Sequence, residues 1–301
     1  ILIKTEVCGV CHTDLHIVEG DLEPHKLPLI PGHQIIGEVV EKGRMVEKFQ
    51  EGDRVGLPWL FSSCGECKFC TKGKENLCRN ANFTGYDVDG AFAEYVDAKS
   101  KFAYSIPENV SAESFAPLLC GGVIGYRAWK LSKTKQGEKL GLWGFGSSAH
   151  IVIQIANYHD QDVYVFTRSD EHKELANKLG AVWVGEAGDE PGTKLDGGII
   201  FAPAGRIVPK ALDVMERGSQ LICAGIHMTS IPELSYDLIY NEKSIKSVAN
   251  STRTDVKELI ELGVEIPIGT TIETFPLRDI NDVLKKIKES KIEASAVINF
   301  R

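Results

Sequence analysis

Residues 140–149 read Leu-Gly-Leu-Trp-Gly-Phe-Gly-Ser-Ser-Ala, an apolar run that leads directly into the spacing G-x-G-x-x-A. The run predicts a strand over 139–143, and the residues after it predict a helix over 148–158. Gly144 permits the tight turn, Gly146 lets the backbone approach a pyrophosphate, and Ala149 allows helix and strand to pack closely. Because the helix N-terminus then faces the phosphate charge, the stretch predicts a dinucleotide-binding loop with contacts from Gly144, Phe145, Gly146, Ser147 and Ser148.

The residues that follow this loop keep alternating between strand and helix patterns. We expect further strands at 163–166, 198–202 and 220–224, and helices at 171–179 and 208–216, the last one stopped by Gly218. A preceding helix is expected over 123–131. Such alternation is typical of a parallel sheet wrapped by helices. We therefore predict an α/β protein with a doubly wound Rossmann domain over 122–249.

The flanking residues have a different pattern. Short β-like stretches at 35–40, 53–57 and 91–96 are separated by Gly and Pro turns, and similar stretches return at 272–277 and 296–300 around a helix that ends near Lys288. We predict a β-rich domain formed by 1–121 and 250–301, into which the Rossmann domain is inserted. The chain opens on an alternating, mid-strand pattern without Met, so we expect an N-terminal segment to be missing.

Four of the eight cysteines lie within 15 residues, in the pattern Cys64-x2-Cys67-x2-Cys70-x7-Cys78. Four thiolates on a tight loop suit one tetrahedral zinc ion, and a site filled by protein ligands is a structural one. Free cysteines and an iron–sulfur cluster are the alternatives, although the spacing differs from common cluster runs. A zinc module that binds nucleic acid needs a basic face, whereas this chain has a net charge of −8.

Three further ligands are separated in the sequence: Cys11, His33 and Cys120. Each signal is weak alone, because a single buried Cys or His is usually a packing residue. Together they supply three protein ligands and leave a fourth position for water, which is the pattern of a catalytic zinc. No apolar stretch reaches the roughly 20 residues that a membrane span needs, and the acidic charge disfavours nucleic acid and anionic membranes as partners.

Besides the four-cysteine loop, the chain contains three short motifs, at 8–16 (Cys-Gly-Val-Cys-His-Thr-Asp-Leu-His), 31–33 (Pro-Gly-His) and 118–122 (Leu-Leu-Cys-Gly-Gly). Together these four motifs resemble the zinc-containing alcohol dehydrogenases of the medium-chain dehydrogenase/reductase superfamily. The order and separation of these motifs match over essentially the whole chain. The resemblance implies a GroES-like catalytic domain, a catalytic zinc on Cys11, His33 and Cys120, and a structural zinc on the four-cysteine loop. It also implies hydride transfer between a small primary alcohol or its aldehyde and NAD(P).

The resemblance assigns roles to residues near these ligands. Asp14 would orient His33, although a helix-capping Asp is the alternative. Thr13 would take the alcohol proton first and His16 would be the outer member of the relay. The remaining expectations are a cofactor contact from His12 and a substrate pocket that includes Trp59 and Leu60. The family usually has Glu where this chain has Gln34, which puts in doubt any transient coordination of the metal by that side chain.

Cofactor preference is expected from the residues after the second Rossmann strand. The acidic position that binds the ribose hydroxyls of NAD falls on Thr167, and Arg168 and Ser169 follow it. A hydroxyl followed by Arg suits a 2′-phosphate, so we predict NADP over NAD, unless Arg168 merely faces solvent. The resemblance further implies a cytoplasmic homodimer or homotetramer. A quinone or enoyl reductase of the same superfamily is the alternative activity, but such relatives generally lack the catalytic metal ligands.

Overall fold

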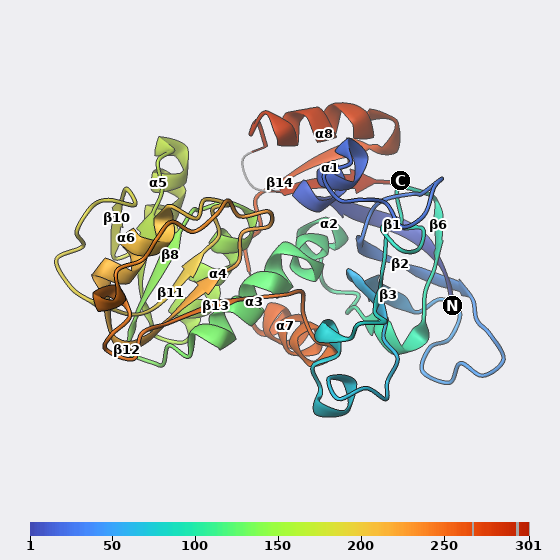
Figure 1. Cartoon of the computed structure of the whole chain (residues 1–301). Helices are drawn as coiled ribbons and strands as arrows, with labels where there is room; N and C mark the ends of the chain where they lie inside the picture. The colour runs from blue at the N-terminus through green and yellow to red at the C-terminus, as the bar shows by residue number, and fades with distance from the viewer. Residues whose placement is uncertain (267, 293–294, 301) are drawn as a thin grey trace. The chain divides into compact units, whose positions relative to one another are not determined.

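The computed structural model describes residues 1–266, 268–292 and 295–300. The chain divides into two compact units, shown in Figure 1. Unit 1 combines Ile1–Val123 with Asn250–Arg301, and unit 2 is Ile124–Ala249. None of the described helices is both long and apolar enough to cross a membrane.

Unit 1 is built around a seven-stranded sheet with the order β14-β15-β1-β2-β3-β7, in which β6 also pairs with β1. The central strands β1 (Leu2–Val10), β2 (Gln34–Glu41) and β3 (Arg54–Leu57) are antiparallel. The other members are β6 (Tyr95–Asp97), β7 (Tyr104–Ser105), β14 (Ile272–Pro276) and β15 (Ser295–Asn299). Ile3, Ile35 and Val55 are fully buried, because alternate residues of these strands enter one core.

Short helices surround this sheet. Helix α1 (His12–Glu19) follows β1 directly, and Leu15 packs in one apolar cluster with Val283 and Ile287 of α8 (Ile280–Lys288). Helices α2 (Ala112–Phe115) and α7 (Arg253–Glu265) complete the unit, together with the small pair β4 (Leu60–Ser62) and β5 (Asn82–Phe83).

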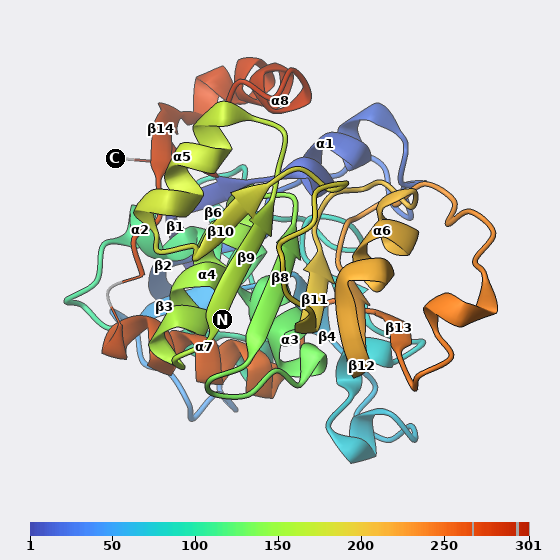
Figure 2. The same cartoon turned by 90° about the vertical axis from the view of Figure 1, so that its left-hand side faces the viewer.

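Unit 2 is a six-stranded parallel sheet in the order β10-β9-β8-β11-β12-β13. Figure 2 looks onto this unit, where most of its strands run side by side. The strands are β8 (Lys139–Trp143), β9 (Asp162–Phe166), β10 (Trp183–Gly185), β11 (Leu195–Ile200), β12 (Met215–Cys223) and β13 (Ser244–Ser247). The helices are α3 (Gly121–Ser132), which begins in unit 1, α4 (Ser147–Tyr158), α5 (Asp170–Lys178) and α6 (Ile207–Val214). This architecture confirms the predicted α/β fold class.

Two of the predicted elements are wrong in part. Within the expected strand at 91–96, only Tyr95 and Val96 are extended partners in the sheet. The preceding residues turn away because Ala91 and Phe92 donate their backbone N–H groups to the carbonyls of Gly32 and Pro31. This places the turn beside the segment that leads into His33.

The helix expected over 208–216 ends at Val214. Met215 instead begins β12, where it pairs with Leu195 of β11. Gly218 has a positive φ of 73° and lies within that strand rather than at a helix end. An apolar residue such as Met215 fits either state, and the neighbouring strand decides between them.

Candidate functional site

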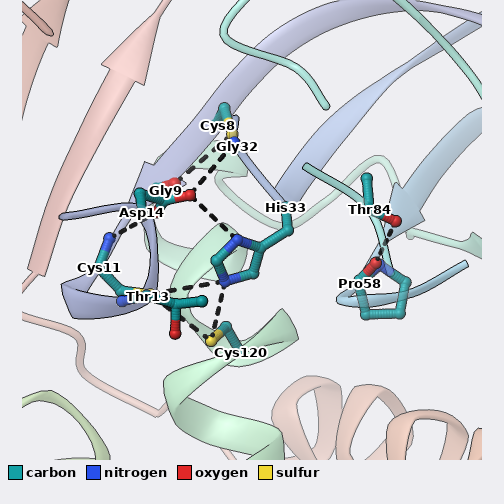
Figure 3. A network of polar contacts seen from close by, with 10 residues as sticks. All are labelled: Cys8, Gly9, Cys11, Thr13, Asp14, Gly32, His33, Pro58, Thr84 and Cys120. Atoms are coloured by element: carbon teal, nitrogen blue, oxygen red, sulfur yellow. Dashed lines mark hydrogen bonds and ion pairs between the residues drawn. The ribbon is translucent and has the colours of Figure 1, made fainter. Parts of the chain in front are cut away.

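Three residues from separate segments of unit 1 converge on one point (Figure 3). Cys11 caps the N-terminus of α1, His33 immediately precedes β2, and Cys120 ends the short 3₁₀ turn Ala116–Leu119. The antiparallel pairing of Gly9 with Gln34 brings the first two of these segments together. His33 Nε2 lies 3.5 Å from Cys11 Sγ and 3.3 Å from Cys120 Sγ, and the two sulfurs are 4.0 Å apart.

Asp14 holds two of these ligands in place. Its Oδ1 contacts His33 Nδ1 at 3.1 Å and accepts the Gly32 N–H at 3.1 Å. Its Oδ2 accepts the backbone N–H of Cys11 at 3.0 Å, as the second half of a capping box. The two roles considered for Asp14 therefore coexist, because one fully buried carboxylate caps the helix and contacts the imidazole.

Electrostatics favour the deprotonated form of only one of these three groups, the Cys11 thiol. The hydrogen bond from Cys120 lowers the pKa of Cys11 well below its ordinary value, and the same contact raises the pKa of Cys120. Burial works against charge on His33, but Asp14 and Cys11 together raise its pKa to about 10. These shifts describe one thiolate, one thiol and a protonated imidazole, so a zinc ion bound here would displace the protons of Cys120 and His33.

The distances between the ligand atoms match the edges of a zinc tetrahedron. With Zn–S near 2.3 Å and Zn–N near 2.0–2.1 Å, such edges are about 3.5–3.8 Å. The observed separations of 3.3–4.0 Å bracket these values. Three protein ligands therefore fit a zinc ion and leave its fourth position for another group.

The four cysteines of the 64–78 loop form a second group of converging ligands. Their sulfurs lie 3.5–3.9 Å apart in the pairs Cys64–Cys78, Cys67–Cys70 and Cys64–Cys70. Gly65 and Gly73 have φ values of 80° and 64°, so the loop folds back at positions that favour glycine. Backbone N–H groups, first that of Cys70, lower the pKa of Cys67 to about 6. This spacing fits one ion, since a polynuclear cluster would hold the sulfurs further apart.

The expected proton-relay residues follow the ligand Cys11 on α1. The backbone N–H of Thr13 donates to Cys11 Sγ at 3.4 Å, and the Thr13 side chain lies beside the ligand cluster in Figure 3. His16 lies one turn further, where its Nδ1 is 2.8 Å from Oδ2 of Asp21. The sequence did not indicate Asp21, because a carboxylate just past a helix end is ordinary. His12 is exposed at the first residue of α1.

The two expected pocket residues have different surroundings. Trp59 is partly exposed, and its ring meets that of His33 edge-on with centroids 4.7 Å apart. Leu60 is 4% exposed and belongs to the β4–β5 pair. Gln34, which stands where the resembling family has Glu, is also buried, and its Nε2 has no hydrogen-bond partner among the residues that the structure describes.

The glycine loop of unit 2 connects β8 to α4 as the pattern predicts. Gly144 has a φ of +88°, and an added Cβ would come within 2.9 Å of the Ala202 nitrogen. An added Cβ on Gly146, in contrast, meets nothing within 4 Å. Ala149 is fully buried against the sheet. The backbone at Gly146 is therefore open to a ligand, at the N-terminus of a helix.

The residues after β9 lie at the carboxyl edge of the same sheet. Thr167 is buried and its N–H donates to the Gly185 carbonyl at 2.8 Å. Ser169 caps α5. Arg168 is exposed and forms no ion pair with any residue in the described part of the chain. Its acidic neighbours have other partners: Asp170 pairs with Lys173, and Glu171 accepts from the Ser169 hydroxyl.

Comparison with known proteins gives consistent matches. The family model of the alcohol dehydrogenase GroES-like domain matches residues 1–108. A probable alcohol dehydrogenase, AdhA, of Mycobacterium tuberculosis is 41% identical, over 99% of this chain and 88% of that protein. An alcohol dehydrogenase of Geobacillus stearothermophilus is 36% identical, over 100% and 91% of the two chains. The solved structure of the CAD of Helicobacter pylori with NADP(H) superposes with a TM-score of 0.91 at 26% identity, and covers 99% of this chain and 90% of that chain.

Proposed function

Because this chain belongs to the zinc-dependent alcohol dehydrogenases of the medium-chain dehydrogenase/reductase superfamily, we propose that Cys11, His33 and Cys120 hold its catalytic zinc. It is an NAD(P)-dependent alcohol oxidoreductase. The observation that carries the assignment is the triangle of ligand atoms, with sides of 3.3, 3.5 and 4.0 Å. We assign a second, structural zinc to the loop of Cys64, Cys67, Cys70 and Cys78.

The chemistry of these groups follows from general principles. A zinc ion with an open position lowers the pKa of an alcohol oxygen and, in the reverse direction, polarises a carbonyl. The nicotinamide ring accepts or supplies the hydride.

The side chains of the chain itself have to position the substrate and move its proton. Asp14 fixes the orientation of His33 and thereby of the ligand set. The Thr13 hydroxyl accepts the proton of the alcohol as it releases its own, and His16 takes up the released proton and passes it outward. Asp21 contacts His16 Nδ1 at 2.8 Å, which favours the ring orientation needed for that transfer. Trp59, whose ring contacts His33, and the neighbouring Leu60 line the substrate pocket.

Cofactor binding is assigned to residues 122–249, and metal binding to 1–121 with 250–301. The loop Gly144–Ser148 would contact the pyrophosphate, and His12 would add a further contact. The unpaired, exposed Arg168 supports NADP over NAD, with Thr167 and Ser169 as neutral partners. The Helicobacter pylori neighbour was solved with NADP(H), which is consistent with this preference.

We further propose a small primary alcohol or its aldehyde as substrate and a homodimer or homotetramer as the assembly, both from the resemblance. Eight free cysteines, seven of them in two ligand groups, support a cytoplasmic enzyme, because thiols persist in a reducing compartment. Light scattering after size-exclusion chromatography would measure the assembly.

The assignment is tested by metal content and activity together. We expect two zinc ions per chain, of which the ion with three protein ligands leaves first under brief chelation. Alcohol oxidation should then stop while circular dichroism still reports the native fold. A quinone or enoyl reductase would contain no catalytic zinc and would reduce its substrates after chelation. Simultaneous loss of both ions and of the fold would contradict separate catalytic and structural roles.

A further inference from the structure

Three aromatic rings lie beside the catalytic ligand His33 and extend away from it. Trp59 meets His33 edge-on, and its ring plane is nearly parallel to those of Phe83 and Tyr86. The centroid distances from Trp59 are 5.2 Å to Phe83 and 5.9 Å to Tyr86, with interplanar angles of 16° and 21°. These are offset-stacked geometries, so the position of Tyr86 contributes to the position of Trp59.

Tyr86 is itself held by a residue from a distant segment. Its hydroxyl donates to the carbonyl of Glu23 at 2.7 Å and lies 3.3 Å from Nε2 of His25, whose ring is tilted against it with centroids 4.6 Å apart. His25 Nδ1 lies 2.6 Å from Oδ1 of Asp87. The other oxygen of Asp87 accepts the backbone N–H of Phe83 at 2.8 Å. The imidazole therefore bridges the carboxylate and the phenol.

The hydrogen atoms in this bridge can be counted. Tyr86 has one hydroxyl proton and gives it to Glu23, so its oxygen can only accept from His25 Nε2. The Asp87 carboxylate can only accept from Nδ1. In this arrangement Nδ1 of His25 faces the Asp87 carboxylate, and its Nε2 faces the Tyr86 hydroxyl.

We propose that His25, Asp87 and Tyr86 form a clasp that positions Trp59 and so controls how the enzyme discriminates between aromatic and short aliphatic alcohols. The inference rests on the proposed reaction centre at Cys11, His33 and Cys120. His25 is a positioning residue, because it acts on the substrate wall through Tyr86. An aromatic substrate gains from stacking against fixed rings by about two- to tenfold in binding. A short aliphatic alcohol contacts little of the wall and gains little.

A second set of contacts joins the same two segments without involving Tyr86. It allows the effect of the clasp to be distinguished from the effect of attaching the two segments to each other. Asp89 contacts Lys26 and accepts the backbone N–H of Ile30 at 3.0 Å. These contacts also hold the 23–30 segment against the 83–89 segment, yet none of them involves an aromatic ring. Asp89→Asn is therefore the matched control for His25→Ala.

The test compares benzyl alcohol with ethanol as substrates of the zinc-loaded holoenzyme. We expect His25→Ala to raise KM for benzyl alcohol about two- to tenfold with little change in kcat, and to leave both constants for ethanol within about twofold. Tyr86→Phe should give the same shift, and the double variant no more than either single one, because both changes remove one shared contact. His25→Asn should recover part of the loss, since its amide nitrogen lies near the position of Nδ1 and can still donate to Asp87.

Fluorescence gives a readout that does not depend on turnover. Subtracting the spectrum of each protein's Trp59→Phe counterpart isolates the emission of Trp59, and this emission should shift to longer wavelength in His25→Ala but not in Asp89→Asn. Equal losses for both alcohols, or the same selectivity change in Asp89→Asn, would overturn the clasp. A native protein that oxidises neither alcohol would instead contradict the proposed function, while the fluorescence comparison would still test the contact.

Discussion

Oε1 of Glu75 accepts hydrogen bonds from both the backbone N–H and the side-chain Nε of Arg253, each at 3.0 Å. Glu75 begins a 3₁₀ turn inside the four-cysteine loop and is 3% exposed, whereas Arg253 is the first residue of α7. One carboxylate therefore joins the four-cysteine loop to the positive end of a helix from the C-terminal part of the chain. The Arg253 guanidinium also lies 5.2 Å from the ring centroid of Phe102.

We expect Glu75→Gln to lower the free energy of unfolding by about 1–3 kcal/mol, because the amide weakens two charge-assisted hydrogen bonds in a buried position. Urea unfolding at neutral pH measures this. The control is Glu261→Gln, which removes the exposed Lys257–Glu261 pair on the same helix and should cost less than about 0.5 kcal/mol. Equal effects of the two substitutions would mean that the Glu75 contact contributes no more to the free energy of unfolding than an exposed ion pair.

The same pair predicts a dependence on pH. Burial alone raises the pKa of Glu75, but the hydrogen bonds from Arg253 outweigh it and lower the pKa below its ordinary value of 4.5. The native state therefore binds fewer protons than the unfolded state, and stability rises with pH in that window. The difference between native protein and Glu75→Gln should be fully present above pH 4.5 and disappear as pH falls through the lowered value.

Thr13→Ala should slow alcohol oxidation by roughly 10²–10⁴-fold, because a positioned proton acceptor contributes about that much. His16→Gln should have a far smaller effect, since water can accept the proton at the outer position. Asp21→Asn should resemble His16→Gln, because it weakens the contact that orients the ring. Steady-state kcat across pH would measure all three. If Thr13→Ala and His16→Gln cause equal and mild losses, there is no relay through these residues.

Substitution of the two glycines in the Gly144–Ser148 loop should have different effects, one on stability and the other on cofactor binding. Gly144→Ala places a side chain at φ +88° and against Ala202, so we expect a stability loss of at least about 1–2 kcal/mol. Gly146→Ala adds a methyl group in open space and should leave the unfolding temperature nearly unchanged. Its KM for the cofactor should rise at least about tenfold, because the methyl group occupies the approach of the pyrophosphate. Unaltered cofactor kinetics in Gly146→Ala would show that phosphate binds elsewhere.

Arg168→Ala should reduce the preference for NADP(H) by roughly 10- to 150-fold, as expected for a charge-assisted hydrogen bond of about 1.5–3 kcal/mol. The guanidinium is available, since Asp170 and Glu171 bond to Lys173 and Ser169. The control is Lys173→Ala, which removes a nearby cation that already pairs with Asp170. It should change the ratio of kcat/KM for NADP to kcat/KM for NAD by less than about twofold. A native enzyme that favours NAD would contradict our interpretation of this loop.

Sequence reasoning predicted the features whose residues lie close together in the chain. The strand, glycine turn and helix at 139–158 follow from local pattern, and so does the four-cysteine loop. The residues Cys11, His33 and Cys120 could be nominated because a family resemblance supplied their long-range relation, and the structure does bring them together.

Features that depend on distant partners could not be predicted in this way. An exposed His25 and a partly buried Asp87 carry no signal until the fold places them 2.6 Å apart. The contact of Glu75 with Arg253 likewise depends on residues from opposite parts of the chain. The short strands β10 and β13 were not predicted, because three or four residues are too few to show a period.

The pairing of β1 with β15, from Val7 with Asn299 to Val10 with Ala296, has a consequence for biosynthesis. A ribosome that adds 5–20 residues per second needs on the order of 15–60 s between making these two strands. Residues 124–249 are contiguous, so unit 2 can finish folding cotranslationally during that interval. The Val7–Val10 part of the nascent β1 meanwhile keeps one hydrogen-bonding edge without its partner, a template for aggregation that a chaperone would have to cover. The sheet whose strands lead into Cys11 and out of His33 is completed only when β15 has left the ribosome.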